Sequence, residues 1–409
     1  MMRKIVSLFS GCGGMDIGFE GNFLCLKKSI NTSIHPNWIK ESFGEWVMLS
    51  PTGFETVFAN DIRGDAKLAW STYFANKKIG AEKIYHLASI VDLVKQANLG
   101  KSIFPDNIDI VTGGFPCQDF SIAGKRQGFE SQKSHTGGKL EAGEPSIESR
   151  GQLYMWMRDV ISITKPKLFI AENVKGLTDL ADVKEIIEQD FSNAANGGYI
   201  VVPARVLYAA DYGVPQSRSR VIFFGFRKNA LKKKALDALT RSVIPSQYDP
   251  YPPKTHGILN APYVTCADAF VGLTEPEDTN DASQKVYSRA KYMGTHCQGQ
   301  TEIKLDSIGP TIRSEHHGNI EYRRLSAEHG GKNYEELAQG LKERRLTVRE
   351  CARIQTFPDD YEFIIPKTST HGSLSSSDAY KIIGNAVPCV LAYNIAKNIE
   401  EKWNLYFKK

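Results

Sequence analysis

Short apolar segments alternate with helical patterns along the first 230 residues or so of the chain. Four of these segments are rich in β-branched or aromatic residues, namely 4–9 (KIVSLF), 55–61 (ETVFAND), 108–114 (IDIVTGG) and 167–174 (KLFIAENV). This alternation is typical of βαβ units. Two further runs, 199–209 and 220–227, have the pattern of strands that complete the sheet. The sequence therefore predicts an α/β fold with a doubly wound, mostly parallel sheet in residues 1–228.

The pattern changes after Arg227. A basic helical stretch, RKNALKKKALDAL, is followed by proline, glycine and polar residues with few long periodic segments, up to about residue 344. We expect residues 229–344 to form a smaller, irregular domain. Helical periodicity resumes at 346–357, and a final apolar helix is predicted from Val387 through Trp403. Residues 345–409 should then return to the sheet and complete the first domain.

Two segments have the character of insertions in that first domain. Residues 21–52 contain scattered tryptophans, and residues 131–147 (SQKSHTGGKLEAGEPSI) are polar and nearly free of bulky apolar groups. Such a composition cannot bury enough apolar surface to offset the entropy of ordering. We expect 131–147 to be a mobile surface loop when no ligand is bound.

Composition narrows the function only slightly. The chain of 409 residues is 41% hydrophobic and 24% charged, as in ordinary globular proteins. It has no apolar run of membrane-spanning length and no start typical of a signal peptide, which predicts a cytoplasmic protein. A net charge of +5 permits a nucleic-acid partner without requiring one. Seven cysteines form no CxxC pair and no cluster with zinc-ligand spacing, so we expect no metal site.

A glycine-rich turn, Ser10 to Gly14, follows the first predicted strand directly. Small residues there would let backbone N–H groups approach a ligand at the mouth of the sheet. A tight strand-to-helix turn with no ligand explains the glycines equally well. The second strand ends in Asp61, whose carboxylate could accept hydrogen bonds from both hydroxyls of a ribose. Together the two features favour adenosine over phosphate as the ligand.

Cys117 follows the strand 108–114 and should stand at the carboxyl edge of the sheet. A thiolate is a good nucleophile where a loop or helix N-terminus lowers the pKa of the thiol, and Pro116 would stiffen the backbone that directs the sulfur. Any single cysteine is more often a packed free thiol. Its place after a strand distinguishes Cys117 from the other six.

Further polar side chains are predicted at the same edge. The strand 167–174 delivers Glu172, a candidate acid that could otherwise cap a helix or pair with a lysine. In QSRSR, the alternation of a strand places Gln216, Arg218 and Arg220 on one face. That face could be a solvated edge or a clamp for an anion.

Six segments carry these features in a fixed order: LFSGCGG, GGFPCQ, ENV, QSRSR, RRLTVRECARIQTFPDDY and GNAVPC. In this order they resemble the motif set of the DNA (cytosine-5-)-methyltransferases, in particular the enzymes of bacterial restriction-modification systems. The resemblance covers most of residues 3–227 and 345–395. It implies a Rossmann-like methyltransferase domain dependent on S-adenosylmethionine, with a smaller target-recognition domain at 229–344.

The resemblance also implies roles for individual residues. Cys117 would attack the base, Glu172 would contact N3 and the exocyclic amine of the cytosine, Arg218 would hold its O2 and Arg220 would support the site. The residues expected to bind the cofactor are Phe9, Gly11, Gly14, Asp61, Ile62, Asn385 and Val387. Those expected to contact DNA are Ser121, Gln216, Arg313, Asn319 and Arg324. For the segment 311–324 the expectation rests on residue types alone: Arg313 or Arg324 could read guanine and Asn319 adenine, while half of these residues could instead contact phosphates or solvent.

The chain departs from the family pattern at three places. Asp61 stands where a glutamate is usual. The acidic residue that contacts the adenine amine would fall near Ser89, and Asp92 is a possible substitute. The catalytic loop is split by the 131–147 insertion, so its closure should differ from that of compact relatives.

The chemistry of cytosine explains why these groups are needed. C5 becomes nucleophilic only after Cys117 adds to C6 while Glu172 stabilises the N3-protonated ring. A base inside a duplex is out of reach, so it must be flipped into the pocket. The expected partner is double-stranded DNA. We expect a bacterial protein that acts as a monomer, and a separate restriction endonuclease is a possible second partner.

Three other interpretations remain at this point. A tRNA cytosine methyltransferase has the same motif order, but its recognition segment is compact. A nicotinamide or flavin oxidoreductase would use the glycine turn, yet it leaves ENV, QSRSR and GNAVPC unexplained. A non-catalytic DNA-binding regulator would need neither Cys117 nor Glu172.

Overall fold

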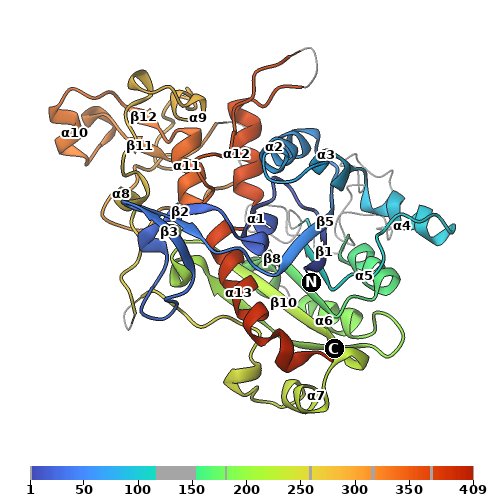
Figure 1. Cartoon of the computed structure of the whole chain (residues 1–409). Coiled ribbons are helices and arrows are strands. Elements are labelled where there is room, and N and C mark those ends of the chain that lie inside the picture. The colour runs from blue at the N-terminus through green and yellow to red at the C-terminus, as the bar shows by residue number, and fades with distance from the viewer. Residues whose placement is uncertain are drawn as a thin grey trace.

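A seven-stranded sheet forms the centre of the molecule (Figure 1). The computed structural model describes residues 2–116, 153–179, 182–257, 260–314, 318–368 and 372–408. In spatial order the strands are β6 (Tyr85–Leu87), β5 (Phe54–Asp61), β1 (Arg3–Leu8), β7 (Ile110–Gly114), β8 (Leu168–Val174), β10 (Ser219–Arg227) and β9 (Tyr199–Tyr208). Neighbours from β6 to β8 are parallel, whereas β10 is antiparallel to β8 and β9. The predicted α/β fold with a mostly parallel sheet is confirmed.

Alternate residues of each central strand face opposite sides of the sheet, and both sides are covered. On β7, Ile110 belongs to one apolar cluster and Val111 to the other, as the two-residue period of a strand requires. One side packs against α4 (Ile90–Asn98), α5 (Leu153–Thr164) and α6 (Val183–Ser192). The other side carries α1 (Gly14–Glu20), α2 (Gly64–Ala75) and the long α13 (Cys389–Tyr406). Helices on both faces make the sheet doubly wound.

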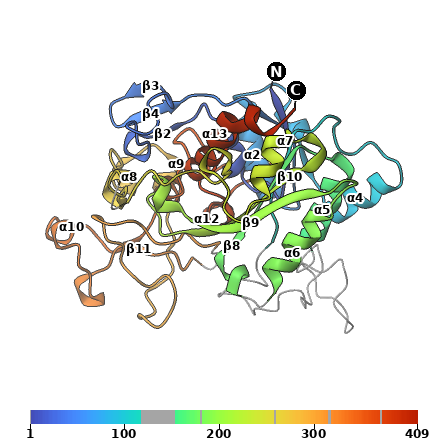
Figure 2. The same cartoon turned by 90° about the horizontal axis from the view of Figure 1, so that it is seen from below.

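The last helix returns to the sheet, as expected, and packs on the first one. Gly18 of α1 lies so close to α13 that a Cβ atom there would stand 2.4 Å from the Cβ of Ala392. Only glycine allows this approach of the two helices. The packing brings the two ends of the chain together, with the Arg3 guanidinium 4.8 Å from the centre of the Trp403 ring (Figures 1 and 2).

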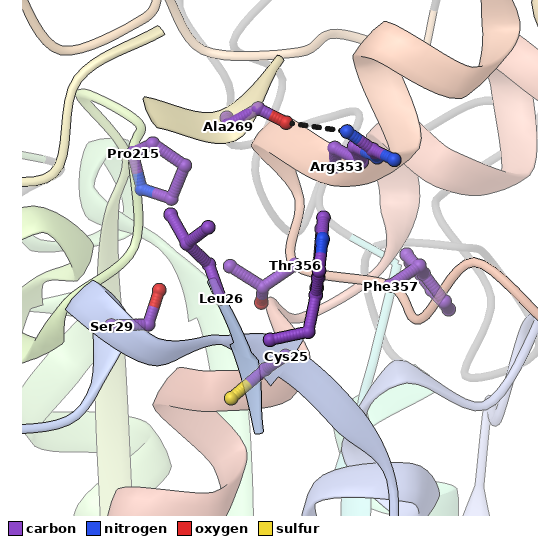
Figure 3. A pocket seen from close by; sticks show the side chains of 9 residues that line it. Cys25, Leu26, Ser29, Pro215, Ala269, Arg353, Thr356 and Phe357 are labelled. Carbon is purple, nitrogen blue, oxygen red and sulfur yellow. Dashed lines mark hydrogen bonds between the residues drawn. The ribbon is translucent and has the colours of Figure 1, made fainter. Parts of the chain in front are cut away.

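The tryptophan-containing insertion, 21–52, folds as a small antiparallel sheet of β2 (Leu24–Leu26), β4 (Trp46–Leu49) and β3 (Ile39–Phe43). Its two tryptophans make contacts at opposite sides: the Trp38 ring lies 5.3 Å from Tyr393 of α13, and Arg353 of α11 (Val348–Ile354) lies 4.6 Å from the Trp46 ring. A void of about 10 Å³, room for one water, lies between this small sheet and residues such as Pro215 and Arg353 that pack near it (Figure 3). The insertion thus packs against both α13 and α11.

Residues 229–257 pack on the main sheet. The helix α7 (Lys233–Leu239) lies beside the C-terminus, and the Tyr251 hydroxyl donates to the carbonyl of Ile222 on β10 at 2.8 Å. Asn398 of α13 donates to the carbonyl of Pro250 at 2.7 Å. This part of the chain is therefore anchored to the main sheet.

The rest of the predicted irregular segment contains only short elements in its described residues. They are α8 (Cys266–Ala269), α9 (Ala282–Lys285), β11 (Tyr322–Arg324), α10 (Tyr334–Ala338) and β12 (Arg344–Arg345). A helix α12 (Ser376–Asn385) lies between this segment and α2, and a short α3 (Ala81–Ile84) precedes β6. Within the described residues no helix is both long and apolar enough to cross a membrane.

Candidate active site

A cavity of about 370 Å³ opens at the carboxyl ends of β1, β5, β7 and β8. Strand ends of this kind are where open α/β sheets bind their ligands. The end of α12 and the turn into α13, residues 384–387, close the cavity from the far side. Segments from almost the whole length of the chain therefore meet at one place.

All of the residues expected to bind the cofactor line this cavity, namely Phe9, Gly11, Gly14, Asp61, Ile62, Asn385 and Val387. Asp61 is held from two sides: the backbone N–H of Gly11 donates to Oδ2 and that of Arg63 to Oδ1, both at 3.0 Å. Burial raises the pKa of Asp61, although these two hydrogen bonds oppose the shift. A carboxylate fixed in this way keeps acceptor capacity for a ligand in the cavity.

The glycine turn has packing reasons as well. A Cβ on Gly13 would lie 2.6 Å from Cδ1 of Trp70, and one on Gly14 would lie 2.2 Å from the carbonyl oxygen of Val387. Gly11 has a left-handed φ of 54°, and its backbone N–H donates to the carboxylate of Asp61. Turn geometry and packing therefore require these glycines, and the turn also lines the cavity.

Glu172 lies at the other end of the cavity, beside β7 and β10. Its Oε1 accepts from Nε of Arg220 at 2.7 Å, and Gly114 on β7 leaves it room, since a Cβ there would be 2.8 Å from Oε2. Burial raises the pKa of Glu172, with Arg220 and Arg218 opposing the shift. Within the part of the chain that the structure describes, the partner of Glu172 is thus an arginine and neither a lysine nor a helix N-terminus.

The two arginines of QSRSR hold places opposite to those expected. Arg220 lines the cavity, whereas Arg218 is only 1% exposed and is not among the lining residues. Arg218 donates to the carbonyls of Ile312, Gly384 and Ala386 at 2.8–3.0 Å. The expected contact of Arg218 with the base is corrected accordingly: Arg218 ties Ile312 to the end of α12, and Arg220 faces the ligand space. Ile312 belongs to residues 229–344, the segment expected to recognise the target, which we call the recognition segment.

Gln216 is also placed differently from the expectation of a DNA contact. Its side chain is fully buried; its Nε2 donates to the carbonyl of Ile354 at 3.2 Å and to Gln355, and its Oε1 accepts from the N–H of Ile312 at 3.1 Å. A side chain that is fully buried among these partners does not reach a base. Gln216 joins α11 to the recognition segment.

The residues expected to act on the base from the catalytic loop, Cys117 and Ser121, lie outside the described residues, as does the 131–147 insertion. The chain just before them is well placed. Phe115 and Pro116 line the cavity, and Asn173 Nδ2 donates to the carbonyl of Phe115 at 3.2 Å. The strand end next to Glu172 therefore fixes the point at which the chain continues to Cys117.

At the adenosine side, Ser89 caps α4 by accepting from the N–H of Val91 at 3.3 Å, and it lines the cavity. Asp92 is exposed on the next turn and is not a lining residue. The suggestion that Asp92 replaces the usual acidic residue is therefore wrong.

The cavity also contains residues that the sequence did not single out. Lys381 stands one helical turn before Asn385 and so shares its face of α12, a spacing that could have revealed it. Ser314 also lines the cavity and belongs to the recognition segment. The backbone of the preceding residue packs on Gly384 of α12, since a Cβ on Gly384 would be 2.1 Å from the carbonyl carbon of Arg313. The recognition segment thus contributes to the cavity wall.

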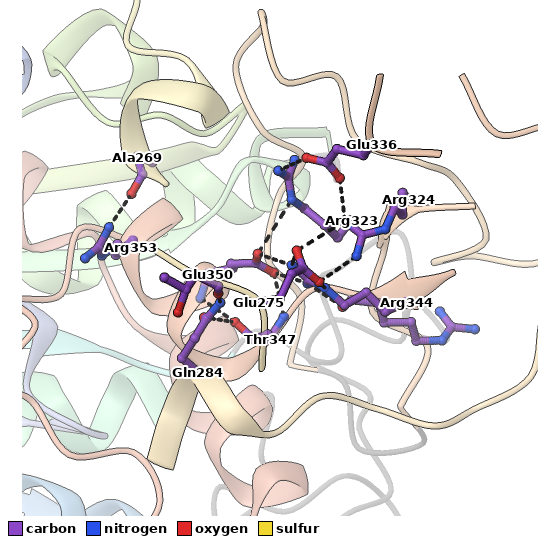
Figure 4. Close-up of polar contacts among 12 residues, drawn as sticks. Ala269, Glu275, Gln284, Arg323, Arg324, Glu336, Arg344, Thr347, Glu350 and Arg353 are labelled. Carbon is purple, nitrogen blue, oxygen red and sulfur yellow. Dashed lines mark hydrogen bonds and ion pairs between the residues drawn. The ribbon is translucent and has the colours of Figure 1, made fainter. Parts of the chain in front are cut away.

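Arg324, expected to read guanine, lies inside a network of arginines and glutamates (Figure 4). It is 1% exposed; its Nε donates to the carbonyl of Lys342 at 2.7 Å, and its other nitrogens bind Glu275 and Glu336. Arg344 joins Glu275 to Glu350 of α11, with both contacts at 2.9 Å. Burial alone would raise the pKa of Glu275, but the bonds from Arg344 and Arg324 lower it to about 2.

These contacts correct the expectation for Arg324, which holds the recognition segment together and is too deeply buried to reach a base. Arg313 is partly exposed; it binds Gln298, the carbonyl of Asn319 and Glu321 at 2.7–3.0 Å. Asn319 is also partly exposed, and its Oδ1 accepts from Gln300 at 3.4 Å. Both residues remain at the surface of the segment.

The sheet, the shared cavity and the Glu172–Arg220 pair agree with a comparison against known families. Residues 3–401 match the C-5 cytosine-specific DNA methylase family. The chain belongs to this family. It is a DNA cytosine methyltransferase, and the interpretations as an oxidoreductase or as a non-catalytic regulator are set aside.

Individual proteins show how far the similarity to this methyltransferase extends. The Type II methyltransferase M.NgoPII of Neisseria gonorrhoeae is 30% identical over 97% of this chain and 95% of its own length. The Type II methyltransferase M.BspRI of Lysinibacillus sphaericus is 32% identical over 97% of this chain and 81% of its own. Among solved structures, S. pombe Dnmt2 methyltransferase superposes with a TM-score of 0.55 at 16% identity, covering 98% of this chain and 99% of that one. The last comparison supports the fold alone.

Proposed function

We propose that this methyltransferase transfers a methyl group from S-adenosylmethionine to C5 of a cytosine within a specific double-stranded DNA sequence. The observation that carries the proposal is the single cavity that joins the residues around Asp61 to the Glu172–Arg220 pair. Methyl transfer requires a donor and an acceptor in one enclosed space. The two halves of the cavity meet that requirement.

The first half fits the adenosine part of S-adenosylmethionine. Asp61 offers a fixed carboxylate that could accept from the ribose hydroxyls, and Ile62 beside it is 50% exposed, an apolar surface on which an adenine could lie. Asn385 and Val387 lie across the cavity from them. When bound there, S-adenosylmethionine would supply the electrophilic methyl group.

The second half fits a cytosine. Glu172 would hold a proton at N3 and accept a hydrogen bond from the exocyclic amine, a task suited to a carboxyl group whose pKa burial has raised. Arg220 would keep Glu172 oriented and donate to O2 of the ring. This role, first expected for Arg218, falls to Arg220 because Arg220 is the arginine that faces the cavity.

Cys117 would act next. Its thiolate would add to C6 and so make C5 nucleophilic; C5 would then bond to the methyl group as the bond between that group and the donor sulfur breaks and S-adenosylhomocysteine leaves. A base would remove the C5 proton, and the C6–S bond would break to release the thiolate. Glu172 is only 7% exposed, so a cytosine stacked in a duplex could not reach it. We therefore propose that the base is flipped out of the helix, at a cost of a few kcal/mol.

We further propose that the catalytic domain comprises residues 1–228 and 345–409 and that 229–344 is the recognition region, with specificity confined to residues 260–344. The contacts of 229–257 with the sheet and α13 support this narrower assignment. Arg313 and Asn319 are the base-reading candidates that remain, because both are partly exposed. Names of relatives such as M.NgoPII, a Type II methyltransferase, support a modification enzyme of a Type II restriction-modification system. We propose that it acts as a cytoplasmic monomer in bacteria, beside a separate endonuclease.

The test of this function uses a random DNA library. The protein is incubated with the library and S-adenosylmethionine, and 5-methylcytosine is mapped by sequencing. We expect methylation at C5 within one short sequence. Methylation of RNA but not of duplex DNA, or no methylation in a preparation that binds S-adenosylmethionine, would contradict the proposal.

A further inference from the structure

The strand β10 runs from the cavity, at its N-terminal end, to the opposite end of the sheet. Arg220 lies at the cavity, whereas Arg227 ends the strand seven residues later, about 23 Å away at roughly 3.3 Å per residue. Phe226 pairs with Leu168, the first residue of β8, while Glu172 lies near the last. Arg227 therefore lies where the strands end on the side away from the active site.

A dense group of positive charges begins at this far edge. Five of the eight residues from 227 to 234 are basic and none is acidic: Arg227, Lys228, Lys232, Lys233 and Lys234. Lys408 joins them, because its N–H donates to the carbonyl of Ala230 at 3.0 Å and its Nζ to that of Asn229 at 3.1 Å. We call these six residues the basic cluster.

No carboxylate of the described residues pairs with the basic cluster. Among the described residues, none of the six forms an ion pair; Lys232 Nζ donates to the carbonyl of Asn404 at 2.6 Å, and Arg227 donates to that of Lys165 at 2.5 Å. The acidic residue on α7 is Asp237, and the nearby Lys167 is already paired with Asp109. Neutral carbonyl partners orient the side chains and leave their charge available.

Helix stability does not explain the lysines. Lys232 is the N-cap of α7, and Lys233 and Lys234 occupy its first turn, where the helix dipole disfavours positive charge. The packing of α7 depends on Ala235, Ala238 and Leu239, which are buried, while all three lysines are exposed. A set of charges that opposes local stability is expected at a functional surface.

We propose that the basic cluster is a second DNA-binding surface, which contacts the phosphates of a duplex segment other than the one at the cavity. In both overall views α7 lies well apart from β11 and α10, and in Figure 1 it is at the opposite end of the molecule (Figures 1 and 2). A duplex is stiff over about 150 base pairs, so a short duplex held at the cavity cannot bend round to α7. The second surface lets the enzyme hold two segments of one long DNA.

The geometry points to a duplex and not to a single strand. Single-strand binding uses exposed aromatic rings on which bases stack. The aromatic residues beside the cluster, Trp403, Tyr406 and Phe407, are buried in the interface with the sheet. Phosphate contacts by lysine and arginine are what remains, and these do not distinguish one sequence from another.

In the test, a short target duplex first occupies the cavity, so that only a second surface can bind further DNA. The protein is loaded on an immobilised short duplex that contains its target, and capture of a labelled duplex made only of A·T pairs, which has no cytosine, is then measured. We expect capture to fall about 40-fold between 50 and 200 mM salt if three phosphates are contacted. The variant K232Q/K233Q/K234Q should lose this capture, and K232R/K233R/K234R should keep it.

Methyl transfer to the short target duplex should stay unchanged in the glutamine variant, which shows that it is folded. The matched control, K83Q/K95Q/K101Q, removes three exposed lysines on α3, on α4 and just after α4. Equal loss of capture in that control, no capture by the wild-type protein, or binding of phosphatidylserine vesicles in place of the second duplex would overturn the proposal. A failure of methyl transfer in every variant would instead count against the proposed function.

Discussion

Arg220 and Glu172 face each other across the antiparallel strands β10 and β8, with Nε and Oε1 2.7 Å apart at the cavity. The pair places a fixed positive charge beside a carboxyl group that burial makes harder to ionise. A carboxyl group of raised pKa can carry a proton to a ring nitrogen, and the guanidinium keeps it in one orientation. The contrast between Arg220 and its neighbour Arg218 gives the first prediction.

Arg220→Met should lower methyl transfer by at least about 100-fold, a usual effect of removing a group that orients general acid catalysis, while the protein stays folded. Arg218→Met should instead destabilise the fold by about 2–5 kcal/mol, because three buried carbonyls lose their donor. Thermal unfolding and single-turnover kinetics on both variants separate the two effects. An inactive, fully stable Arg218→Met would show that the first assignment of the arginines was correct.

Glu172 should make folding depend on pH in a defined direction. Its folded-state pKa is raised above the ordinary value of 4.5. Its contribution is therefore fully favourable below pH 4.5 and is lost as the pH rises through the raised folded-state value. Denaturant unfolding of the wild type and of Glu172→Gln should show the wild type losing stability relative to the variant over that range. A constant difference between the two would mean that burial does not raise this pKa.

Asp61 should control the affinity for S-adenosylmethionine. Asp61→Asn should weaken binding by about 1–3 kcal/mol, as expected for hydrogen bonds to a charged group, with little change in DNA affinity. Calorimetry measures both affinities. Asp65→Asn is the matched control, since Asp65 pairs with Arg63 but does not line the cavity. Equal cofactor affinity in wild type and Asp61→Asn would remove Asp61 from the site.

Specificity should move with residues 260–344. Grafting this segment of the chain onto a related methyltransferase should transfer the methylated sequence, because the preceding residues 229–257 are tied to the catalytic sheet. Sequencing of methylated library DNA checks the result. A chimera that keeps the specificity of the recipient would show that the reading residues lie elsewhere.

The sequence predicted the sheet well because its strands are long apolar runs. It predicted the glycine turn and Asp61 at one cavity because the carboxyl ends of parallel strands meet at one edge. Phe9 and Val387 were expected there only from the family resemblance, and Val387 reaches the cavity from the turn between α12 and α13. The short β6, with three residues, has too little pattern to be recognised.

Alternation along QSRSR could not tell which arginine faces a ligand. Residues 218 and 220 point to the same side of a regular strand, but β10 begins only at Ser219. Arg218 lies just before it and turns to carbonyls of Ile312 and Gly384, which are distant in the sequence. The positions of Gln216 and Arg324 likewise depend on partners more than ten residues away, Ile354 and Glu275 among them, which no local pattern contains.

The nucleophile is the central claim, and a trapped intermediate tests it most directly. If Cys117 adds to C6 and its release needs removal of the C5 proton, fluorine at C5 blocks that release. Duplex DNA with 5-fluorocytosine at the target, incubated with the enzyme and S-adenosylmethionine, should give an adduct that survives denaturation and maps by peptide mass to Cys117. Cys117→Ala should bind the duplex but form no adduct. An adduct at Cys12 or Cys351, or methyl transfer that persists in Cys117→Ala, would contradict this mechanism.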